Sequence, residues 1–102
     1  MKQPAVYIMT NKPNGTLYVG VTSDLIKRAY LHRNSLVDGF TKKYACNSLV
    51  FFEVHQTMES AILREKQIKA GSRQKKIKLI ETKNSAWADL YPQITGLSTS
   101  KL

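Results

Sequence analysis

The spacing of hydrophobic residues changes along the chain, and each change marks the boundary of a predicted element. Residues 5–10 and 16–22 are rich in Val, Ile, Tyr and Thr, which favour strands, and the Asn-Lys-Pro-Asn-Gly between them contains the residues that turns require. This pattern predicts a β-hairpin. Residues 34–47 are expected to form a loop, and the apolar run at 49–54 predicts a third, largely buried strand.

Helical spacing of apolar residues predicts three helices, at about residues 25–33, 58–70 and 73–82. Each is preceded by side chains that can accept hydrogen bonds from the first free backbone N–H groups of a helix. These predicted N-caps are Thr22, Ser23 or Asp24 for the first helix, Thr57 for the second and Ser72 for the third. Gly71 is expected to end the second helix, since glycine commonly follows the last turn.

The end of the chain is expected to dock on the core through a short segment that contains Trp87 and Leu90 and stops at Pro92. The polar residues beyond it are expected to fray. The elements together predict an α+β domain over residues 1–92, with strands and helices in the order ββαβαα, followed by a C-terminal tail over 93–102.

Positive charge distinguishes this chain from an ordinary globular protein. Among its 102 residues, 16 Lys and Arg outnumber 7 Asp and Glu, which gives a net charge of +9. Two basic segments, residues 1–44 with +5 and 64–83 with +6, flank an apolar stretch of −2. A field of this sign on so small a body attracts polyanions, so we expect a nucleic-acid partner, DNA first and RNA second.

Other partners and compartments fit the sequence less well. No apolar run approaches the ~20 residues that span a bilayer, and the N-terminus lacks the layout of a signal peptide. We therefore expect a cytoplasmic protein with no membrane partner and no small-molecule cofactor. A single cysteine, Cys46, forms no internal disulfide, in keeping with a reducing compartment.

The predicted hairpin brings two tyrosines together. If Thr10 and Gly15 close its turn, Tyr7 lies directly across the strands from Tyr18, and both phenol rings share one face of the sheet. An aromatic cross-strand pair is a sufficient structural explanation for these two residues by themselves.

Three polar residues on the predicted helices add to this pair. Arg28 and His32 are spaced i, i+4 and so share a helix face, and Glu65 falls on an otherwise apolar stripe. A solvated helix face would account for the first two, and an ion pair with Lys69 or Arg64 would account for Glu65. Each explanation covers one feature, and none covers all of them together with the basic charge.

Taken jointly, these residues indicate metal-assisted cleavage of a phosphodiester bond. One carboxylate, completed by water and phosphate oxygens, suits Mg²⁺ or Mn²⁺, and Glu65 would supply it. Arg28 would hold a phosphate and stabilise the charge of the transition state. A tyrosine hydroxyl, whose ordinary pKa is near ~10, needs a neighbouring cation before it can activate water at neutral pH. His32 would move protons near pH 7 or contact phosphate.

The order and spacing of these residues also resemble a known family. Ala-Val-Tyr at residues 5–7 and Tyr-Val-Gly at 18–20 precede Arg28, His32 and the helix that carries Glu65. The pattern resembles the GIY-YIG nuclease superfamily and is most similar to its small stand-alone bacterial members. Valine replaces both motif isoleucines, and alanine replaces the first glycine. The valine substitutions keep an apolar side chain of similar volume, so we expect the fold to tolerate them.

The resemblance implies a compact α/β domain in which helices flank a three-stranded antiparallel sheet. It also implies that this domain hydrolyses DNA with a single metal ion. It implies family roles for five residues: Tyr7 and Tyr18 as the motif tyrosines, one of which activates the nucleophile; Arg28 as the phosphate-binding arginine; Glu65 as the metal ligand; and His32 as a histidine found in some members. It also matches Gly20 to the glycine of the second motif, where a missing side chain allows close approach.

DNA affinity is expected to come from basic side chains that contact phosphates without reading the base sequence. The expected contacts are Lys27, Arg28, Arg33, Lys42, Lys43, Lys66, Lys69, Arg73, Lys75, Lys76 and Lys78.

Our leading hypothesis is a divalent-metal-dependent DNA endonuclease, or a structure-selective nuclease of DNA processing such as repair. The alternatives are a non-catalytic nucleic-acid-binding module that retains the nuclease fold and a small RNA-binding or ribosome-associated protein. A carboxylate facing phosphates has no evident use in either alternative, and this favours the enzyme.

Overall fold

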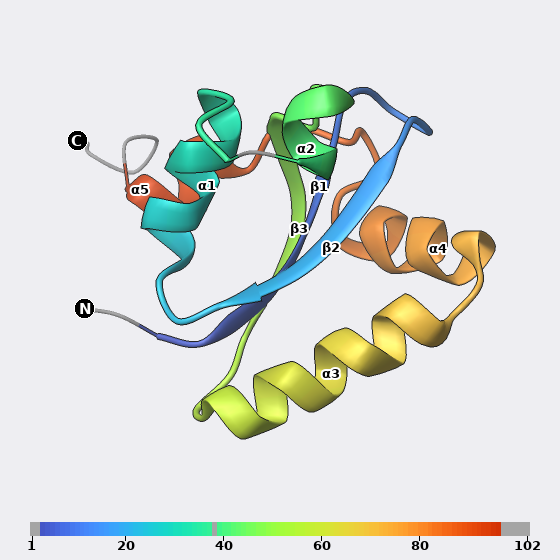
Figure 1. Ribbon diagram of the computed structural model, residues 1–102. Coiled ribbons are helices and arrows are strands. Elements are labelled where there is room, and N and C mark those ends of the chain that lie inside the picture. The colour runs from blue at the N-terminus through green and yellow to red at the C-terminus, as the bar shows by residue number, and fades with distance from the viewer. Residues whose placement is uncertain (1–2, 38, 97–102) are drawn as a thin grey trace.

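The computed structural model describes residues 3–37 and 39–96 of the chain. An antiparallel sheet in the order β2-β1-β3 forms the centre of the fold, and helices cover both of its faces (Figure 1). The elements are β1 (Ala5–Thr10), β2 (Leu17–Thr22), α1 (Leu25–Arg33), α2 (Phe40–Lys43), β3 (Ser48–Val54), α3 (Met58–Ala70), α4 (Arg73–Lys83) and α5 (Tyr91–Thr95). The predicted α+β architecture with three antiparallel strands is confirmed.

The three long helices begin at the predicted caps. Each cap side chain accepts a hydrogen bond from the backbone N–H three residues later, which satisfies a donor that the first helical turn leaves free. The pairs are Asp24 with Lys27 for α1, Thr57 with Ser60 for α3 and Ser72 with Lys75 for α4. Gly71 ends α3, as predicted.

The hairpin loop is longer than predicted. Thr10 pairs with Leu17, so residues 11–16 lie outside the ladder. The Asn11 side chain accepts a hydrogen bond from the Thr16 N–H at 2.9 Å, and the Thr10 hydroxyl donates to the Thr16 carbonyl at 2.8 Å. These side-chain bonds satisfy the loop backbone locally, so the strands do not pair as far as the tightest turn would allow.

This loop shifts the predicted register by two residues. Tyr7 lies opposite Gly20, and Met9 lies opposite Tyr18, so the predicted direct pairing of the two tyrosines is wrong. Side chains alternate between faces with a period of two, so a shift of two residues leaves both tyrosines on the same face. They are diagonal neighbours across the strands.

Two short helices lie where the sequence predicted none. Helix α2 interrupts the predicted loop and follows Gly39. The φ of Gly39 is 97°, a value that glycine adopts readily because it has no side chain. Helix α5 contains Pro92 in its first turn, where proline is tolerated, so Pro92 does not stop the segment as predicted. Gln93 and Ile94 of the predicted tail belong to this helix, and residues 97–102 lie outside the described residues.

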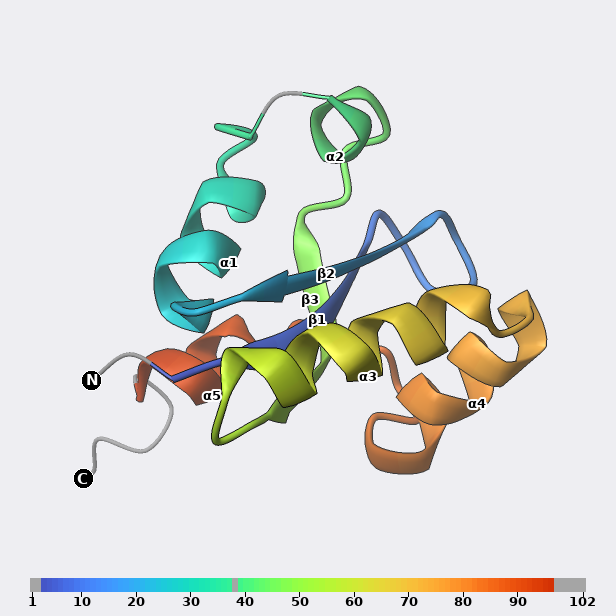
Figure 2. The ribbon, with the colours of Figure 1, turned by 60° about the horizontal axis from the view of Figure 1, so that its bottom comes forward.

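The two faces of the sheet support separate clusters of buried side chains. In both views α1 and α2 lie on one side of the sheet, and α3 and α4 lie on the other (Figures 1 and 2). The α3 side buries Val6, Ile8, Val19, Val50, Phe51, Ala61, Ile68, Ile80 and Trp87, and the α1 side buries Tyr7, Met9, Ala29, Cys46 and Leu49.

Trp87 and Leu90 dock on these clusters, as predicted. The Trp87 indole also donates a hydrogen bond of 2.7 Å to the Glu81 carboxylate. Among the described residues, no helix has the length and apolar character needed to cross a membrane.

Candidate active site

Gly20 provides the space that the Tyr7 ring occupies. A Cβ atom at position 20 would lie 2.5 Å from both Cζ and the hydroxyl of Tyr7, and 3.0 Å from Cε2 of Tyr18. The Tyr7 ring therefore extends over β2 at the one position of that strand that carries no side chain. The ring centroids of Tyr7 and Tyr18 are 6.3 Å apart.

Tyr7, His32 and Thr41 form a buried hydrogen-bonded chain. The Tyr7 hydroxyl lies 3.0 Å from His32 Nε2, and His32 Nδ1 lies 3.1 Å from the Thr41 hydroxyl. The three residues are at most 3% exposed. This burial keeps His32 away from direct contact with a phosphate on the protein surface, one of the two roles that the sequence left open for it.

Burial also sets the protonation of these groups. It raises the pKa of the Tyr7 phenol well above its usual range, an effect to which the neighbouring Tyr18 adds and which Arg28 opposes without outweighing it. Burial, together with the nearby Arg28 charge, lowers the pKa of His32 to about 4. At neutral pH Tyr7 is therefore a protonated phenol beside a neutral imidazole.

Arg28 is exposed one helical turn before His32, on the same face of α1. Its charge acts on the pKa of both Tyr7 and His32. Within the described part of the chain, its guanidinium has no hydrogen-bond or ion-pair partner. It is therefore available to an anion that binds here.

Glu65 reaches the same site from α3. Its negative charge contributes to the raised pKa of Tyr7, so the carboxylate acts electrostatically on the phenol, although α3 packs on the other face of the sheet. The Glu65 side chain is 14% exposed and forms an ion pair of 2.9 Å with Lys69. The ion pair with Lys69 considered from the sequence is thus present, whereas Arg64 pairs with Glu53.

The donor set suits a hard cation held by few protein ligands. Over residues 3–37 and 39–96, no cluster of three His, Cys, Asp or Glu side chains could hold a metal ion. One carboxylate is nevertheless enough for Mg²⁺, which keeps several waters and takes further oxygens from substrate phosphates. Glu65 is a candidate for such a carboxylate, since its charge acts on Tyr7.

Phe40 and Thr41 join the site from α2, and sequence reasoning missed both. Thr41 bonds to His32, and the Phe40 ring lies 6.0 Å from that of Tyr18. A single hydroxyl residue in a predicted loop carries no sequence signal. The i, i+4 spacing of Phe40 and Tyr44 was the available indication of a helical turn.

The predicted phosphate-binding residues differ in whether their side chains already have partners within the fold. Some support the fold: Arg33 forms an ion pair with Asp89, and Arg73 donates hydrogen bonds of 2.7 Å to the carbonyls of Asn14 and Gly15. Others are exposed, and no hydrogen bond or ion pair of their side chains is recorded among the described residues. These are Lys27, Lys66, Lys75 and Lys78, with Arg28 at the site itself.

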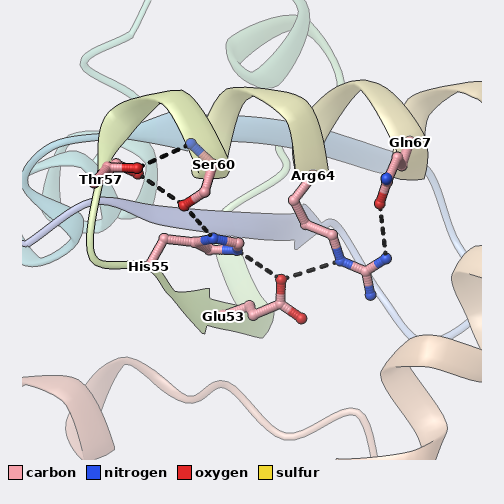
Figure 3. Close-up of polar contacts among 6 residues, drawn as sticks. All are labelled: Glu53, His55, Thr57, Ser60, Arg64 and Gln67. Carbon is pink, nitrogen blue, oxygen red and sulfur yellow. Dashed lines mark hydrogen bonds and ion pairs between the residues drawn. The ribbon is translucent and has the colours of Figure 1, made fainter.

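A polar clasp holds the start of α3 to the end of β3 (Figure 3). We use this name for Glu53, His55, Ser60 and Arg64. The Glu53 carboxylate accepts hydrogen bonds from His55 at 2.8 Å and from Arg64 at 3.0 Å, and the second ring nitrogen of His55 lies 2.9 Å from the Ser60 hydroxyl. Because Arg64 precedes Glu65 in the helix, the clasp fixes the rotation and position of the turn that carries the candidate metal ligand.

The structure is a small α+β domain in which Tyr7 and Tyr18 share one face of the sheet, and the charges of Arg28 and Glu65 act on Tyr7. Residues 3–78 match the GIY-YIG catalytic domain, and the chain belongs to this family. The resemblance seen in the motif residues is confirmed.

Similar proteins are small and bacterial. The UPF0213 protein of Staphylococcus saprophyticus is 40% identical over 80 residues, which cover 78% of this chain and 96% of the relative. A UPF0213 protein of Staphylococcus epidermidis is 35% identical over 79% of this chain and 98% of its own length. The solution NMR structure of a UPF0213 protein from Bacillus halodurans matches with a TM-score of 0.54 and 26% identity, over 90% of this chain and 96% of that one.

Proposed function

We propose that this protein is a divalent-metal-dependent nuclease that hydrolyses phosphodiester bonds in DNA, as an endonuclease or a structure-selective DNA-processing enzyme. The observation that carries the proposal is the packing of Tyr7 over Gly20, beside Tyr18 and His32, at a position where the charges of both Arg28 and Glu65 act on its phenol. The net charge of +9 supports a polyanionic substrate.

Each of the polar side chains has a distinct part in this reaction. Glu65 would hold Mg²⁺ or Mn²⁺, and the bound ion would supply positive charge to the attacking water and to the phosphate. Arg28 binds the phosphate and stabilises the charge that develops on it. Tyr18, diagonal to Tyr7 and partly exposed, helps to orient the water.

Tyr7 and His32 provide a route for the proton of that water. In the tautomer in which His32 Nδ1 donates to Thr41, Nε2 accepts a hydrogen bond from the Tyr7 hydroxyl. The neutral imidazole would accept the phenol proton while the phenol oxygen accepts one from water, and its lowered pKa means that it would hold this proton only briefly before releasing it. This assigns nucleophile activation to Tyr7 and proton transfer to His32.

One observation favours a second candidate, a nucleic-acid-binding module without catalysis. The Glu65 carboxylate is already neutralised by Lys69 at 2.9 Å, as expected if it only stabilises α3. A module of this kind would bind DNA through the same basic surface and cleave no strand with any metal.

Replacing Glu65 with glutamine separates the two candidates. Glu65→Gln keeps the size and helix propensity of the side chain but removes the charge that would hold the ion. We expect cleavage of a labelled DNA panel in Mg²⁺ or Mn²⁺ to fall by at least about 100-fold, with DNA binding retained. Because the Lys69 side chain is 52% exposed, solvent weakens its ion pair with Glu65, and we expect the thermal midpoint to change little.

Glu59→Gln is the matched control. Glu59 is exposed in the first turn of the same helix, so this variant makes the same chemical change outside the site. Cleavage by Glu59→Gln should equal that of the parent. Equal cleavage by Glu65→Gln would remove Glu65 from the site, and the absence of cleavage by the parent on every strand structure would favour the binding module.

A further inference from the structure

A groove with aromatic and basic walls adjoins the candidate active site. It has a volume of about 460 Å³ and is lined by Leu17, Tyr18 and Val19 of β2, Phe40 of α2, Lys69 of α3 and Lys76 of α4. In Figure 2, α2 lies on one side of β2, while α3 and α4 lie on the other. Tyr18 belongs to both the groove and the site, so whatever occupies the groove lies next to the reacting groups.

The aromatic wall is unusually open to solvent. Phe40 is 45% exposed and Tyr44 is 42% exposed, although their ring centroids are only 4.8 Å apart. The ring centroid of Tyr18 lies 6.0 Å from that of Phe40, on which it borders. The Lys43 ammonium lies 5.4 Å from the centre of the Tyr44 ring. Large apolar rings left exposed beside cations are suited to stacking on a nucleic-acid base.

The opposite wall can hold a phosphate. The Lys69 ammonium pairs with Glu65, and the Lys76 ammonium donates to the Gly71 carbonyl at 2.7 Å. Each ammonium has three N–H donors, so these contacts orient the side chains and leave donors for a further anion. A ligand that complements both walls needs a flat aromatic surface and a negative charge.

We propose that this groove binds one unpaired DNA nucleotide, with its base stacked on Phe40 and its phosphate held by Lys69 and Lys76. The proposal rests on the proposed function, because it names the part of the substrate that lies beside the site. A base within a duplex has both faces covered by its neighbours and cannot stack on Phe40. The groove therefore selects DNA with an unpaired nucleotide next to the cleaved phosphate.

Base removal in the ligand, combined with substitution of Phe40, tests the stacking contact. Fluorescence anisotropy in EDTA measures the affinity for a short oligothymidylate, for the same strand with abasic residues, and for a blunt duplex. The parent should prefer the oligothymidylate over the abasic strand by at least about 5-fold, since one stacked base is worth about 5- to 150-fold in affinity. Phe40→Leu should abolish this preference without changing abasic or duplex binding.

Three further variants control for folding and for charge. Phe40→Trp keeps a stacking surface and should retain the preference, whereas Tyr30→Leu alters an exposed tyrosine outside the groove and should have no effect. Lys76→Gln should weaken binding of intact and abasic strands equally. Lys83→Gln makes the same change of charge on the same helix but outside the groove, so it should weaken the binding of both strands less.

The proposal is overturned if the parent binds intact and abasic strands equally, or if Phe40→Leu weakens every ligand alike. An occupant other than DNA, such as an apolar protein segment, predicts the first of these results. Because binding is measured without metal and without cleavage, a failure here leaves the Glu65→Gln result intact. If cleavage proved not to depend on Glu65, the stacking result would likewise remain valid.

Discussion

Gly20 is the residue on which the geometry of the site depends most directly. Gly20→Ala would place a methyl group 2.5 Å from the Tyr7 ring, within a buried cluster that cannot expand freely. We expect a loss of about 1–3 kcal/mol in the free energy of unfolding, because the ring must move. Displacement of Tyr7 should also lower cleavage by about 100-fold, measured on the same preparation by urea unfolding and strand cleavage.

Gly71→Ala provides the comparison for this substitution. At Gly71 an added Cβ would lie 3.4 Å from its nearest neighbour, and φ is −76°, which alanine adopts without strain. Stability should stay the same or rise by up to about 1 kcal/mol, since alanine restricts the unfolded chain. Equal effects of the two alanine variants would contradict the close packing of Tyr7 over position 20.

His32 should make the stability of the protein depend on pH in the weakly acidic range. Its pKa is about 4 in the folded protein and about 6.5 in an unfolded chain. Below pH 6.5 the unfolded state takes up a proton that the folded state refuses, so stability falls as the pH decreases from about 6.5 to 4 and then levels off. Each pH unit in this window costs up to about 1.4 kcal/mol.

Two measurements check the assignment to His32. Urea unfolding of His32→Gln, which keeps polar atoms but has no titrating ring, should show a weaker loss of stability over the same pH range. NMR titration of the parent should give an imidazole midpoint near pH 4 for His32. A midpoint near 6.5 would mean that the ring is solvated and that the buried hydrogen-bonded chain of Tyr7, His32 and Thr41 does not form in solution.

At the scale of elements, the polar clasp of Figure 3 holds the start of α3 against β3. Burial acts to raise the pKa of the Glu53 carboxyl, but hydrogen bonds and charges from His55 and Arg64 outweigh it and lower the pKa. The clasp therefore contributes stability above the ordinary pKa of a glutamate and loses it as the pH falls through the lowered value. The stability that the clasp contributes is therefore lost at a more acidic pH than most of the stability that depends on His32.

Breaking the clasp should affect catalysis more than stability. We expect Glu53→Gln to reduce stability by about 1 kcal/mol, because the ion pair is partly exposed, and to reduce cleavage by about tenfold, because α3 carries Glu65. A double-mutant cycle with Arg64→Gln should give a coupling of similar size. Parental cleavage by a destabilised Glu53→Gln would show that the clasp has no positioning role for Glu65.

At the scale of the whole molecule, the net charge of +9 should dominate DNA affinity. The logarithm of the association constant for duplex DNA should fall linearly with the logarithm of salt concentration, by ~0.9 per phosphate contact. Lys27 and Arg33 both lie on α1, but Arg33 is paired with Asp89. Lys27→Gln should therefore reduce the slope by about one contact, and Arg33→Gln should reduce it less.

Salt titration of the two variants by fluorescence anisotropy tests this distinction. A slope near zero for the parent would remove the electrostatic basis of binding. Equal slopes for Lys27→Gln and Arg33→Gln would mean that the contact with Asp89 gives way when DNA binds.

The sequence by itself determined the long elements and the identity of the candidate residues. Helices α1, α3 and α4 follow from apolar spacing and from caps at Asp24, Thr57 and Ser72, which act within a few residues. The family motif located the two tyrosines, Arg28 and Glu65, because chemistry restricts which residue types can serve at each position. These signals depend on residue types and on their spacing along the chain, so the sequence contains them.

Only the tertiary structure decided how these residues meet. The register that puts Tyr7 over Gly20 depends on hydrogen bonds within the hairpin loop, and two registers that differ by two residues present the same hydrophobic face. The bond from His32 to Thr41 joins segments whose contact depends on α2, a helix too short to have a hydrophobic period. Burial of Tyr7 and His32, which sets their pKa values, arises when the chain folds, because desolvation is a property of the packed molecule and of no single residue.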